Sequence, residues 1–345
     1  MSAGYKNPKH ILIPGIGCQP FTDKVFSLIG EHYNEDSVGI RYTKSELFAN
    51  GEWRIQIDTE HVIRNRHVYI FASGVKYKSH SINDIIVHTL GLIDACQRAD
   101  VKSITLIWLL FPYARSDKKV VSREPIMASM LIKLLDSYDK IRRIVTMDIH
   151  SGQLQGFTSK VFTNLFANPC IKEYMTEVCK NAPNGAVLVS PDTGSVRRIK
   201  DYMKDSSKLQ IFSVTVSKTR SYSENNVIES SSLSDADKEL IRDKTAIIID
   251  DIIDTAGTIV STASVLESAG VNSICVFATH GILSHPAIER LNNCRIIERV
   301  FVTDTIDQTE NLSLCPKLTV ISVSDLISQY ILCLLEDKSL STLYE

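Results

Sequence analysis

Two adjacent carboxylates, Asp250 and Asp251, follow a short apolar run in this sequence. The run covers residues 245–249 and predicts a buried strand, and ligands of α/β sheets bind where such strands end. The next residues are polar or small and lead into a predicted helix that ends at Gly270: Asp254, Thr255, Ala256, Gly257 and Thr258. Backbone N–H groups and hydroxyls of this turn, aided by the helix dipole, can hold a phosphate. We therefore interpret residues 254–258 as a phosphate loop.

The two carboxylates before this loop would repel an anion, so we expect them to contact a different group. Asp250 and Asp251 can accept hydrogen bonds from vicinal sugar hydroxyls or hold a hydrated Mg²⁺. Gly257 permits a positive φ and a close approach of the ligand, and Thr258 can cap the helix. Together these features predict a sugar-phosphate site. The alternative, an acidic helix start in an ordinary loop, is disfavoured by two consecutive acids after a buried strand.

A long polar segment, residues 217–232, carries Lys218 and Arg220 directly after a predicted strand at 211–216. A polar loop of this length inside a compact domain is either disordered or functional. In an extended chain the i, i+2 spacing directs both cationic side chains to one side. We interpret this basic segment either as a solvated loop or as a catalytic lid.

Three further residues are suited to a nucleotide. Arg115 follows an aromatic-rich strand, where it can stack on a base, pair with a phosphate or form a surface ion pair. Phe48 precedes an Asn-Gly turn signal, so it is either a core residue or a stacking platform for adenine. His150 lies beside a carboxylate at the exit of a predicted strand at 144–147, which suits either a Mg-nucleotide contact or a structural role.

Short β-branched runs alternate with amphipathic stretches, which is typical of parallel α/β architecture. Strands are predicted at 10–14, 67–72, 103–109, 144–147, 186–190, 211–216, 245–249, 273–279 and 299–303. Helices are predicted at 22–31, 82–99, 124–138, 169–180, 195–204, 258–268 and 323–336. Interruptions of the pattern place a domain boundary near 155–170, and we expect the helical C-terminus to pack back on the first half.

The composition excludes several classes of protein. A chain of 345 residues predicts two domains, and 38 Lys and Arg against 40 Asp and Glu leave a net charge of −2. This balance gives no bulk attraction to nucleic acid or to a membrane surface, so we expect neither as a partner. Eight scattered cysteines without a Cys-x-x-Cys pair, a polar N-terminus and the absence of a bilayer-spanning apolar stretch predict a cytoplasmic protein with reduced thiols.

The segment 248–258 resembles the phosphoribosyl-diphosphate binding loop of type I phosphoribosyltransferases, and its extended form is most similar to that of the ribose-phosphate pyrophosphokinases. Other segments resemble the same family: 48–52 its ATP-contacting Phe-x-x-Gly-Glu, 113–119 its ATP-binding turn, 148–157 its histidine segment and 190–194 its second metal-linked loop. The resemblance runs from about residue 10 to the C-terminus. Each motif is weak alone, but the set is specific.

The resemblance implies two similar phosphoribosyltransferase-type (Rossmann-like) domains, each a mainly parallel sheet flanked by helices. Residues 1–164 would form the ATP-side domain, 165–322 the ribose 5-phosphate-binding domain, and 323–345 a C-terminal helix. It also implies that the loop of Phe48 reaches the site of a neighbouring subunit. We therefore expect a homo-oligomer, with dimers that assemble into a hexamer.

The family pattern also implies roles for the candidate residues. The implied ATP-binding residues are Phe48, Asn50, Glu52, Arg115, Ser116, Asp117 and His150. The implied ribose 5-phosphate-binding residues are Asp250, Asp251, Asp254, Thr255, Ala256, Gly257 and Thr258. Lys218 and Arg220 match the lysine and arginine of the family's flexible catalytic loop. His150 and Asp192 would bind Mg²⁺, the expected cofactor.

The implied activity is that of a ribose-phosphate diphosphokinase, which converts ribose 5-phosphate and Mg·ATP to phosphoribosyl diphosphate and AMP. A non-catalytic, synthetase-associated subunit and a phosphoribosyltransferase are the alternatives. Retention of Lys218, Arg220 and Gly257 disfavours the first, and separate ATP segments disfavour the second. Four residues depart from those common in the family and bear on regulation by phosphate and ADP more than on catalysis: Ser116, Ser159, Thr163 and Thr219.

Overall fold

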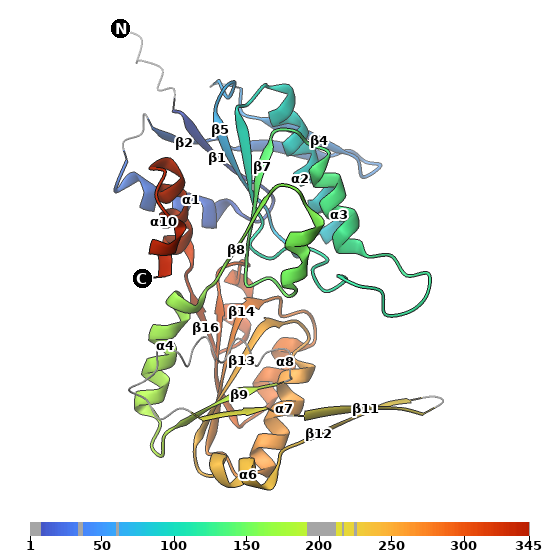
Figure 1. The fold of residues 1–345 in the computed structure, drawn as a ribbon, viewed down its shortest axis with the longest axis vertical. Helices are drawn as coiled ribbons and strands as arrows, with labels where there is room; N and C mark the ends of the chain where they lie inside the picture. The colour runs from blue at the N-terminus through green and yellow to red at the C-terminus, as the bar shows by residue number, and fades with distance from the viewer. Residues whose placement is uncertain are drawn as a thin grey trace. The chain divides into compact units, whose positions relative to one another are not determined.

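The computed structural model describes residues 8–33, 37–59, 62–191, 212–215, 217–223 and 226–344, with the backbone alone for those between 212 and 232. The chain divides into two compact units (Figure 1). Unit 1 contains Met1–Phe166, Thr305–Asp307 and Val323–Glu345, and unit 2 contains Ala167–Asp304 and Gln308–Ser322. Each unit is built on its own parallel sheet, which confirms the predicted α/β fold class.

Unit 1 has a six-stranded sheet in the order β2-β1-β5-β6-β7-β8, and every neighbouring pair is parallel. Its strands are β1 (His10–Pro14), β2 (Val38–Ile40), β5 (His67–Phe71), β6 (Ser103–Ile107), β7 (Ile141–Met147) and β8 (Val161–Leu165). Its helices are α1 (Gln19–Gly30), α2 (Ile82–Arg98), α3 (Met127–Asp136) and α10 (Ser324–Leu335), with short 3-10 helices η1 (Gly152–Phe157) and η2 (Leu340–Tyr344).

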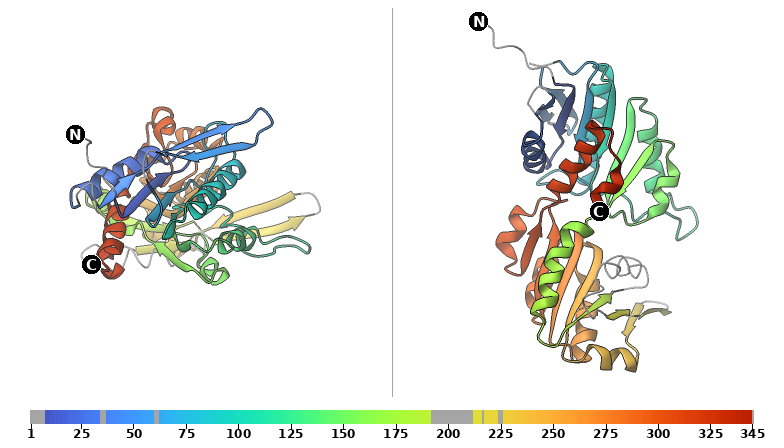
Figure 2. Two further views of the ribbon diagram at one scale, coloured as in Figure 1. Left: turned by 90° about the horizontal axis from the view of Figure 1, so that it is seen from above. Right: turned by 60° about the vertical axis from the view of Figure 1, so that its left-hand side comes forward.

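Helices cover both faces of this sheet. α2 and α3 share one core with inward side chains of β1, β5, β6 and β7, and α1 packs beside α10 on the opposite face (Figures 1 and 2). Two hydrogen bonds fasten the C-terminal residues to unit 1. The Tyr33 hydroxyl donates to Glu336 Oε1 at 3.0 Å, and the Phe166 N–H donates to the Tyr344 hydroxyl at 2.9 Å.

An antiparallel hairpin of β3 (Thr43–Leu47) and β4 (Trp53–Ile57) lies against α2. The start of α2 is fixed by a capping box, in which Ser81 and Asp84 exchange hydrogen bonds and satisfy N–H groups of the first turn. Gly91 of α2 allows β4 to approach, because a Cβ there would collide with the Ile55 side chain. The β3–β4 hairpin therefore packs on α2 at a defined position.

Unit 2 has a six-stranded parallel sheet in the order β10-β9-β13-β14-β15-β16. Its strands are β9 (Ala186–Ser190), β10 (Phe212–Thr215), β13 (Thr245–Ile253), β14 (Ser273–Gly281), β15 (Ile297–Thr303) and β16 (Leu318–Ile321). Its helices are α4 (Asn168–Asn181), α6 (Asp235–Ile241), α7 (Gly257–Ser268), α8 (Ala287–Asn293) and α9 (Thr309–Leu314). β11 (Ser217–Ser223) and β12 (Asn226–Ser232) form a separate antiparallel hairpin.

The centre of unit 2 is apolar on both faces of the sheet. β14 is buried along its whole length. α6, α7 and α8 share one core with β13, β14 and β15, and on the other face the ring of Tyr174 from α4 contacts Phe301 edge-on. No helix within the described ranges is both long enough and apolar enough to cross a membrane.

Several elements differ from the sequence-based predictions. Residues 161–165, expected to interrupt the pattern at a domain boundary, form β8 at the edge of the first sheet. The basic segment, expected as a loop, pairs with itself as β11 and β12 because its alternating Ser, Thr, Val and Ile suit an extended hairpin. Short elements such as β2, β16 and α9 carry too few residues for a periodic signal. The helix predicted at 195–204 lies outside the described residues.

Two glycines test how closely the strands and loops of unit 1 pack. Gly74 has no room for a side chain, since a Cβ would overlap the backbone carbonyl of Leu110. We expect Gly74→Ala to lower the free energy of unfolding by about 1–3 kcal/mol. Gly30, in α1, has no heavy atom within 4 Å of its Cβ position, so Gly30→Ala should raise that free energy by about 0.5–1 kcal/mol. Urea unfolding of both variants measures the difference, and equal stability would contradict the packing described.

Candidate active site

The phosphate loop, residues 254–258, follows β13 in unit 2. β9 has β10 on one side and β13 on the other, so the strand order reverses between β9 and β13. Ligands of open α/β sheets bind outside the carboxyl ends of the strands at such a reversal. The phosphate loop therefore lies where the topology favours a ligand.

The backbone of this loop corrects two sequence-based expectations. Ala256, and not Gly257, has the positive φ, at 58°, and it forms the N-cap of α7. Gly257 and Thr258 already belong to the first turn of the helix, so Thr258 does not cap it. A left-handed conformation costs an alanine about 1–2 kcal/mol. Contacts around the loop must therefore hold Ala256 in this conformation.

The resulting turn is suited to an anion. The N-cap residue of α7, Ala256, makes no side-chain capping bond, and the first-turn N–H groups of a helix have no partner within the helix. Successive backbone N–H groups around a left-handed residue form a concave nest that binds phosphates, and the helix dipole adds to its attraction. This geometry is compatible with the predicted role of residues 254–258.

The two carboxylates lie within β13 and not after it, because the strand continues to Ile253. Asp250 is half-buried, pairs in register with Ala278 of β14 and accepts the Asp251 N–H on its Oδ1 at 2.9 Å. Asp251 is only 5% exposed. Consecutive strand residues point to opposite faces, so the two carboxylates leave β13 in different directions and can serve different groups.

The tip of the β3–β4 hairpin presents an aromatic ring to solvent. Phe48 is 52% exposed, and its backbone is fixed by a bond from its N–H to the Glu52 carbonyl and another from the Gly51 N–H to its own carbonyl, each 2.8 Å. Gly51 supplies the positive φ of 88° that the turn requires. Asn50 Oδ1 accepts the Glu52 N–H at 3.2 Å. The turn is thus rigid and the ring is accessible for stacking.

A buried histidine connects this hairpin to α2. His88 is fully buried, its Nε2 shares a 2.8 Å hydrogen bond with Ser45 of β3, and its ring contacts Trp53 of β4 edge-on. Burial, and then the nearby His80, lowers the pKa of His88 from 6.5 to about 4, so the ring is neutral at pH 7. Sequence reasoning misses Ser45 and His88, because neither type nor spacing distinguishes them from ordinary helix and strand residues.

Arg115 and Ser116 lie in the connection from β6 to α3. Arg115 is exposed, whereas Ser116 is half-buried. Ser116 ties the turn to the helix, because its Oγ accepts the Met127 N–H at 3.4 Å and its carbonyl accepts the Ala128 N–H at 3.2 Å. Asp117 follows, also half-buried. The serine thus holds the start of α3, which keeps Arg115 beyond the carboxyl end of β6.

His150 lies beyond the carboxyl end of the neighbouring strand, β7, and is exposed. The approach to it is fixed, since the Asp148 N–H donates to the Leu165 carbonyl at 2.8 Å and the Ile149 N–H donates to Asn164 Oδ1 at 2.9 Å. Because β6 and β7 are parallel neighbours, Arg115 and His150 follow the same edge of the sheet. Unit 1 therefore gathers an arginine and a histidine at one edge.

The basic segment is placed by its backbone register. Lys218 is opposite Ser231 and Arg220 is opposite Glu229 on β12, with Thr219 between the two cationic residues. Figure 1 shows the hairpin extending away from the sheet of unit 2. Lys218 and Arg220 are therefore alternate residues of one strand, and their side chains lie outside the described part of the chain.

The donor set can be compared with the needs of Mg²⁺. Asp192 lies outside the described residues, and among those described no cluster of three or more His, Cys, Asp or Glu can hold a metal ion. In nucleotide sites Mg²⁺ usually keeps several waters and takes one or two carboxylates together with substrate phosphates. Asp250 and Asp251 beside an anion-binding loop fit this pattern. An imidazole such as His150 suits softer metals better than Mg²⁺.

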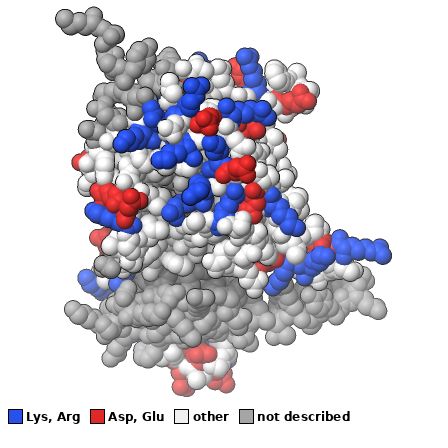
Figure 3. Space-filling model, turned by 45° about the horizontal axis from the view of Figure 1, so that its top comes forward, with Lys and Arg blue, Asp and Glu red and all other residues white. Residues whose placement is uncertain are grey.

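The near-zero net charge does not mean a surface without charge. Figure 3 shows many lysine and arginine side chains on the coloured part of the surface in that view, with carboxylates among them. Each of the eight cysteines, all within the described ranges, is a free thiol. Burial raises the pKa of Cys18 and Cys96 to about 12, so neither thiol ionises at pH 7.

Comparisons with known proteins agree over most of the chain. Residues 12–138 match the family model described as the N-terminal domain of ribose phosphate pyrophosphokinase, and residues 237–345 match that of the phosphoribosyl synthetase-associated domain. Ribose-phosphate pyrophosphokinase A of Dictyostelium discoideum is 34% identical over 330 residues, which cover 93% of this chain and 98% of the relative. Ribose-phosphate pyrophosphokinase 1 of Streptococcus mutans is 34% identical over 313 residues, which cover 90% and 91%.

A solved structure is also similar over nearly all of the chain. The crystal structure of phosphoribosylpyrophosphate synthetase from Mycobacterium smegmatis superimposes with a TM-score of 0.81 at 30% sequence identity. The match covers 95% of this chain and 99% of that one. Both units of the present chain therefore have counterparts in a single synthetase polypeptide.

The buried His88 makes stability depend on pH. Below pH 6.5 the unfolded chain binds a proton that folded His88 does not accept until about pH 4, so the free energy of unfolding should fall between pH 7 and pH 4, by at most about 3 kcal/mol from this residue. His88→Gln, whose amide can still reach Ser45, should flatten that decline. His32→Gln, at an exposed position, should not. Urea unfolding across this pH range measures both slopes, and equal slopes would exclude His88 as a source.

Proposed function

The chain belongs to the ribose-phosphate pyrophosphokinase family, and we propose that it transfers the β,γ-diphosphoryl group of Mg·ATP to the C1 hydroxyl of ribose 5-phosphate. The products are 5-phosphoribosyl 1-diphosphate and AMP, the first of which serves nucleotide biosynthesis. The observation that carries this proposal is the phosphate loop at the strand reversal of unit 2, with a left-handed Ala256 at the start of α7 and two carboxylates before it. A sugar phosphate needs an anion nest and hydroxyl acceptors together.

The reaction requires positioning and charge neutralisation more than covalent help from the protein. The oxygen of the C1 hydroxyl forms a bond to the β-phosphorus, the bond from that phosphorus to the α,β-bridging oxygen breaks, and the hydroxyl proton is released. In the proposed site residues 254–258 hold the 5-phosphate. Asp250 and Asp251, which leave β13 in different directions, supply carboxylates for the ribose hydroxyls and for the metal.

The proposed ATP site uses residues of unit 1. Phe48 stacks on adenine, supported by its exposure and rigid turn. Arg115 pairs with phosphate, His150 lies at the same sheet edge, and Asn50, Glu52, Ser116 and Asp117 complete the set carried over from the family. Ser116 would act partly through the backbone, because its hydroxyl and carbonyl already fix the start of α3.

Lys218 and Arg220 are the proposed catalytic residues. Cationic donors aimed at the transferring group stabilise the charge that develops in the transition state. A hairpin that extends from its sheet can bring both residues over a bound triphosphate and exclude water, as closing loops do in other enzymes. Their alternate places on β11 give both the same strand face.

Mg²⁺ is the proposed cofactor, and when bound it would neutralise negative charge on the triphosphate. Asp250 and Asp251 supply carboxylates of the kind that it prefers. His150 and Asp192 are the metal-binding residues expected from the family. We also propose a homo-oligomer of dimers, in which the exposed Phe48 hairpin reaches a neighbouring subunit, and a cytoplasmic location, which the free thiols support.

Removal of the lid lysine tests the activity. Purified protein with Mg·ATP and ribose 5-phosphate should release AMP, and only when both are present. Lys218→Ala should lower kcat about 10²–10³-fold, because a preorganised donor to the transition state is lost. Thr219→Ala, between the two cationic residues, should retain activity. ATP hydrolysis that is independent of ribose 5-phosphate would refute the function, and an unchanged kcat would refute the role of Lys218.

Truncation of the exposed ring tests the ATP site. Phe48→Ala should raise the KM for ATP about tenfold, since base–aromatic stacking contributes about 1–3 kcal/mol, and should leave the KM for ribose 5-phosphate unchanged. Leu47→Ala removes another exposed apolar side chain, 43% exposed, from the same hairpin and should change neither KM. Steady-state kinetics with each substrate varied in turn distinguishes these outcomes. Equal effects of the two substitutions would remove the stacking role.

A further inference from the structure

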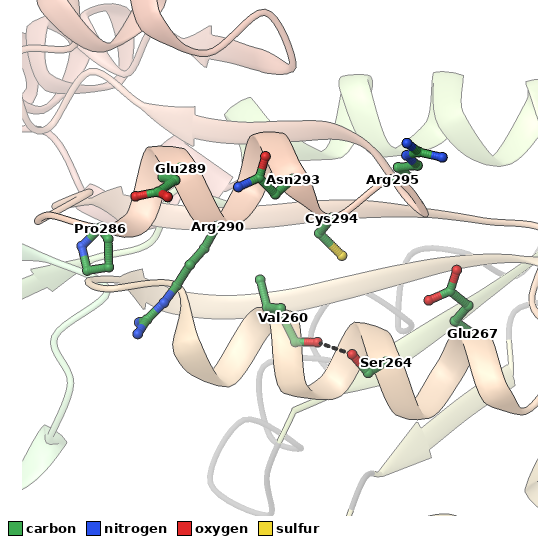
Figure 4. Close-up of a pocket in the computed structure, with 9 residues that line it drawn as sticks. All are labelled: Val260, Ser264, Glu267, Pro286, Glu289, Arg290, Asn293, Cys294 and Arg295. Atoms are coloured by element: carbon green, nitrogen blue, oxygen red, sulfur yellow. Dashed lines mark hydrogen bonds between the residues drawn. The ribbon is translucent and has the colours of Figure 1, made fainter.

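An arginine outside the proposed substrate site holds the phosphate loop from behind. Arg290 belongs to α8, and its Nη1 donates a hydrogen bond to the backbone carbonyl of Thr255 at 2.9 Å. Figure 4 shows its side chain leaving α8 and pointing toward the N-terminal end of α7. The residue lines a groove of about 550 Å³ between these two helices, together with Val260, Ser264 and Glu289. Arg290 thus links α8 to the loop that precedes α7.

The bonded carbonyl determines where the next N–H points. The peptide between Thr255 and Ala256 is trans, and in a planar trans peptide the carbonyl and the N–H point in opposite directions. A donor that holds the Thr255 oxygen on the side of α8 therefore directs the Ala256 N–H away from α8. A flip of this peptide would exchange the two groups and turn the carbonyl oxygen toward a bound anion.

Backbone strain at Ala256 favours rotation of the Thr255–Ala256 peptide. Ala256 is held at φ 58°, a left-handed conformation that is unfavourable for alanine. Rotation of the preceding peptide changes this φ and would relieve the strain. The hydrogen bond from the Arg290 guanidinium to the Thr255 carbonyl opposes this rotation, because the rotation would break it. Hydrogen bonds from charged donors are stronger than those from neutral donors.

Gly257 lies next to the Arg290 guanidinium. A Cβ on Gly257 would lie 3.4 Å from Arg290 Nη1, so the guanidinium rests directly against the backbone at the start of α7. The end of β13 is fixed independently, because the Leu283 N–H donates to the Ile253 carbonyl at 3.0 Å. The Thr255 carbonyl is the part of the loop that Arg290 controls.

We propose that Arg290 is a positioning residue for ribose 5-phosphate, which keeps the Thr255–Ala256 peptide in the orientation that presents the Ala256 N–H to the 5-phosphate. This inference rests on the proposed function of the phosphate loop. Arg290 acts through the backbone and does not touch the substrate. Its loss should therefore weaken the binding of ribose 5-phosphate selectively, without an equal effect on ATP.

Kinetics and direct binding test the proposal. Arg290→Gln should raise both the KM and the calorimetric Kd for ribose 5-phosphate about tenfold, the scale seen when groups that orient a binding residue are removed, with the KM for ATP changed less than about twofold. Arg290→Lys, with a single ammonium in place of the planar fork, should give a smaller rise. Arg295→Gln alters another arginine of the same groove and should change neither constant.

A second substitution distinguishes a role of Arg290 in orienting the Thr255–Ala256 peptide from a general role in stabilising the fold. Glycine adopts a positive φ without strain, so Ala256→Gly in the Arg290→Gln background should restore at least about a third of the lost affinity for ribose 5-phosphate. The proposal is overturned if Arg290→Gln leaves the KM and Kd for ribose 5-phosphate unchanged. It is also overturned if Arg290→Gln shifts both KM values and the thermal midpoint together and the double variant shows no recovery. If Arg290→Gln does not fold, Arg290→Lys decides, and wild-type constants for it overturn the proposal.

The proposed function can fail separately. A wild-type chain that binds ribose 5-phosphate without releasing AMP would refute the diphosphokinase activity, and the Kd values of the variants would still decide the role of Arg290. An active wild-type enzyme whose Arg290→Gln variant keeps its KM would refute the role of Arg290 alone. A wild-type chain that does not bind ribose 5-phosphate would refute both.

Discussion

In a parallel sheet every strand ends at the same edge, and the functional geometry of both units depends on that constraint. Residues that follow successive strands are brought to one edge whatever their separation in sequence, as Arg115 after β6 and His150 after β7 are in unit 1. In unit 2 the reversal of strand order between β9 and β13 leaves space beyond the strand ends, and the phosphate loop begins there. Strand order thus determines where the candidate functional residues of each unit lie, and their side chains determine what they can bind.

Preorganisation in this chain comes largely from backbone hydrogen bonds. Ser116 fixes the start of α3, the turn at Phe48 closes on itself, and the Thr255 carbonyl is held by Arg290. Such bonds fix the groups that we propose to face a ligand, and because the bonds are formed before a ligand arrives, less conformational entropy would be lost on binding. The fully buried His88, neutral at pH 7, likewise connects the β3–β4 hairpin to α2 through its hydrogen bond with Ser45.

The sequence predicts the fold class and the strand–turn–helix order around residues 254–258 well because strong local signals carry them. The apolar run before Asp250 and the small residues before Thr258 are compatible with few local structures besides a buried strand and a tight turn, and long periodic helices such as α2 begin and end within a residue of the predicted bounds. Details set by tertiary contacts are not predictable in this way. The positive φ falls on Ala256 rather than on the adjacent glycine, since a partner on α8 and not local propensity decides it. The pairing of β11 with β12 and the burial of His88 depend likewise on distant partners.

The division of the chain has a consequence for its synthesis. Unit 1 is built from segments on both sides of unit 2 in sequence, and α10, which follows unit 2 in the chain, packs on α1, which precedes it. A ribosome must therefore complete unit 2 before the sheet of unit 1 can be covered on that face. During translation the apolar side chains of α1 remain exposed until the C-terminal helix emerges, and such transient exposure favours aggregation. Cover for this side of α1 thus comes from a segment that follows unit 2 in the chain, although each finished unit has a core of its own.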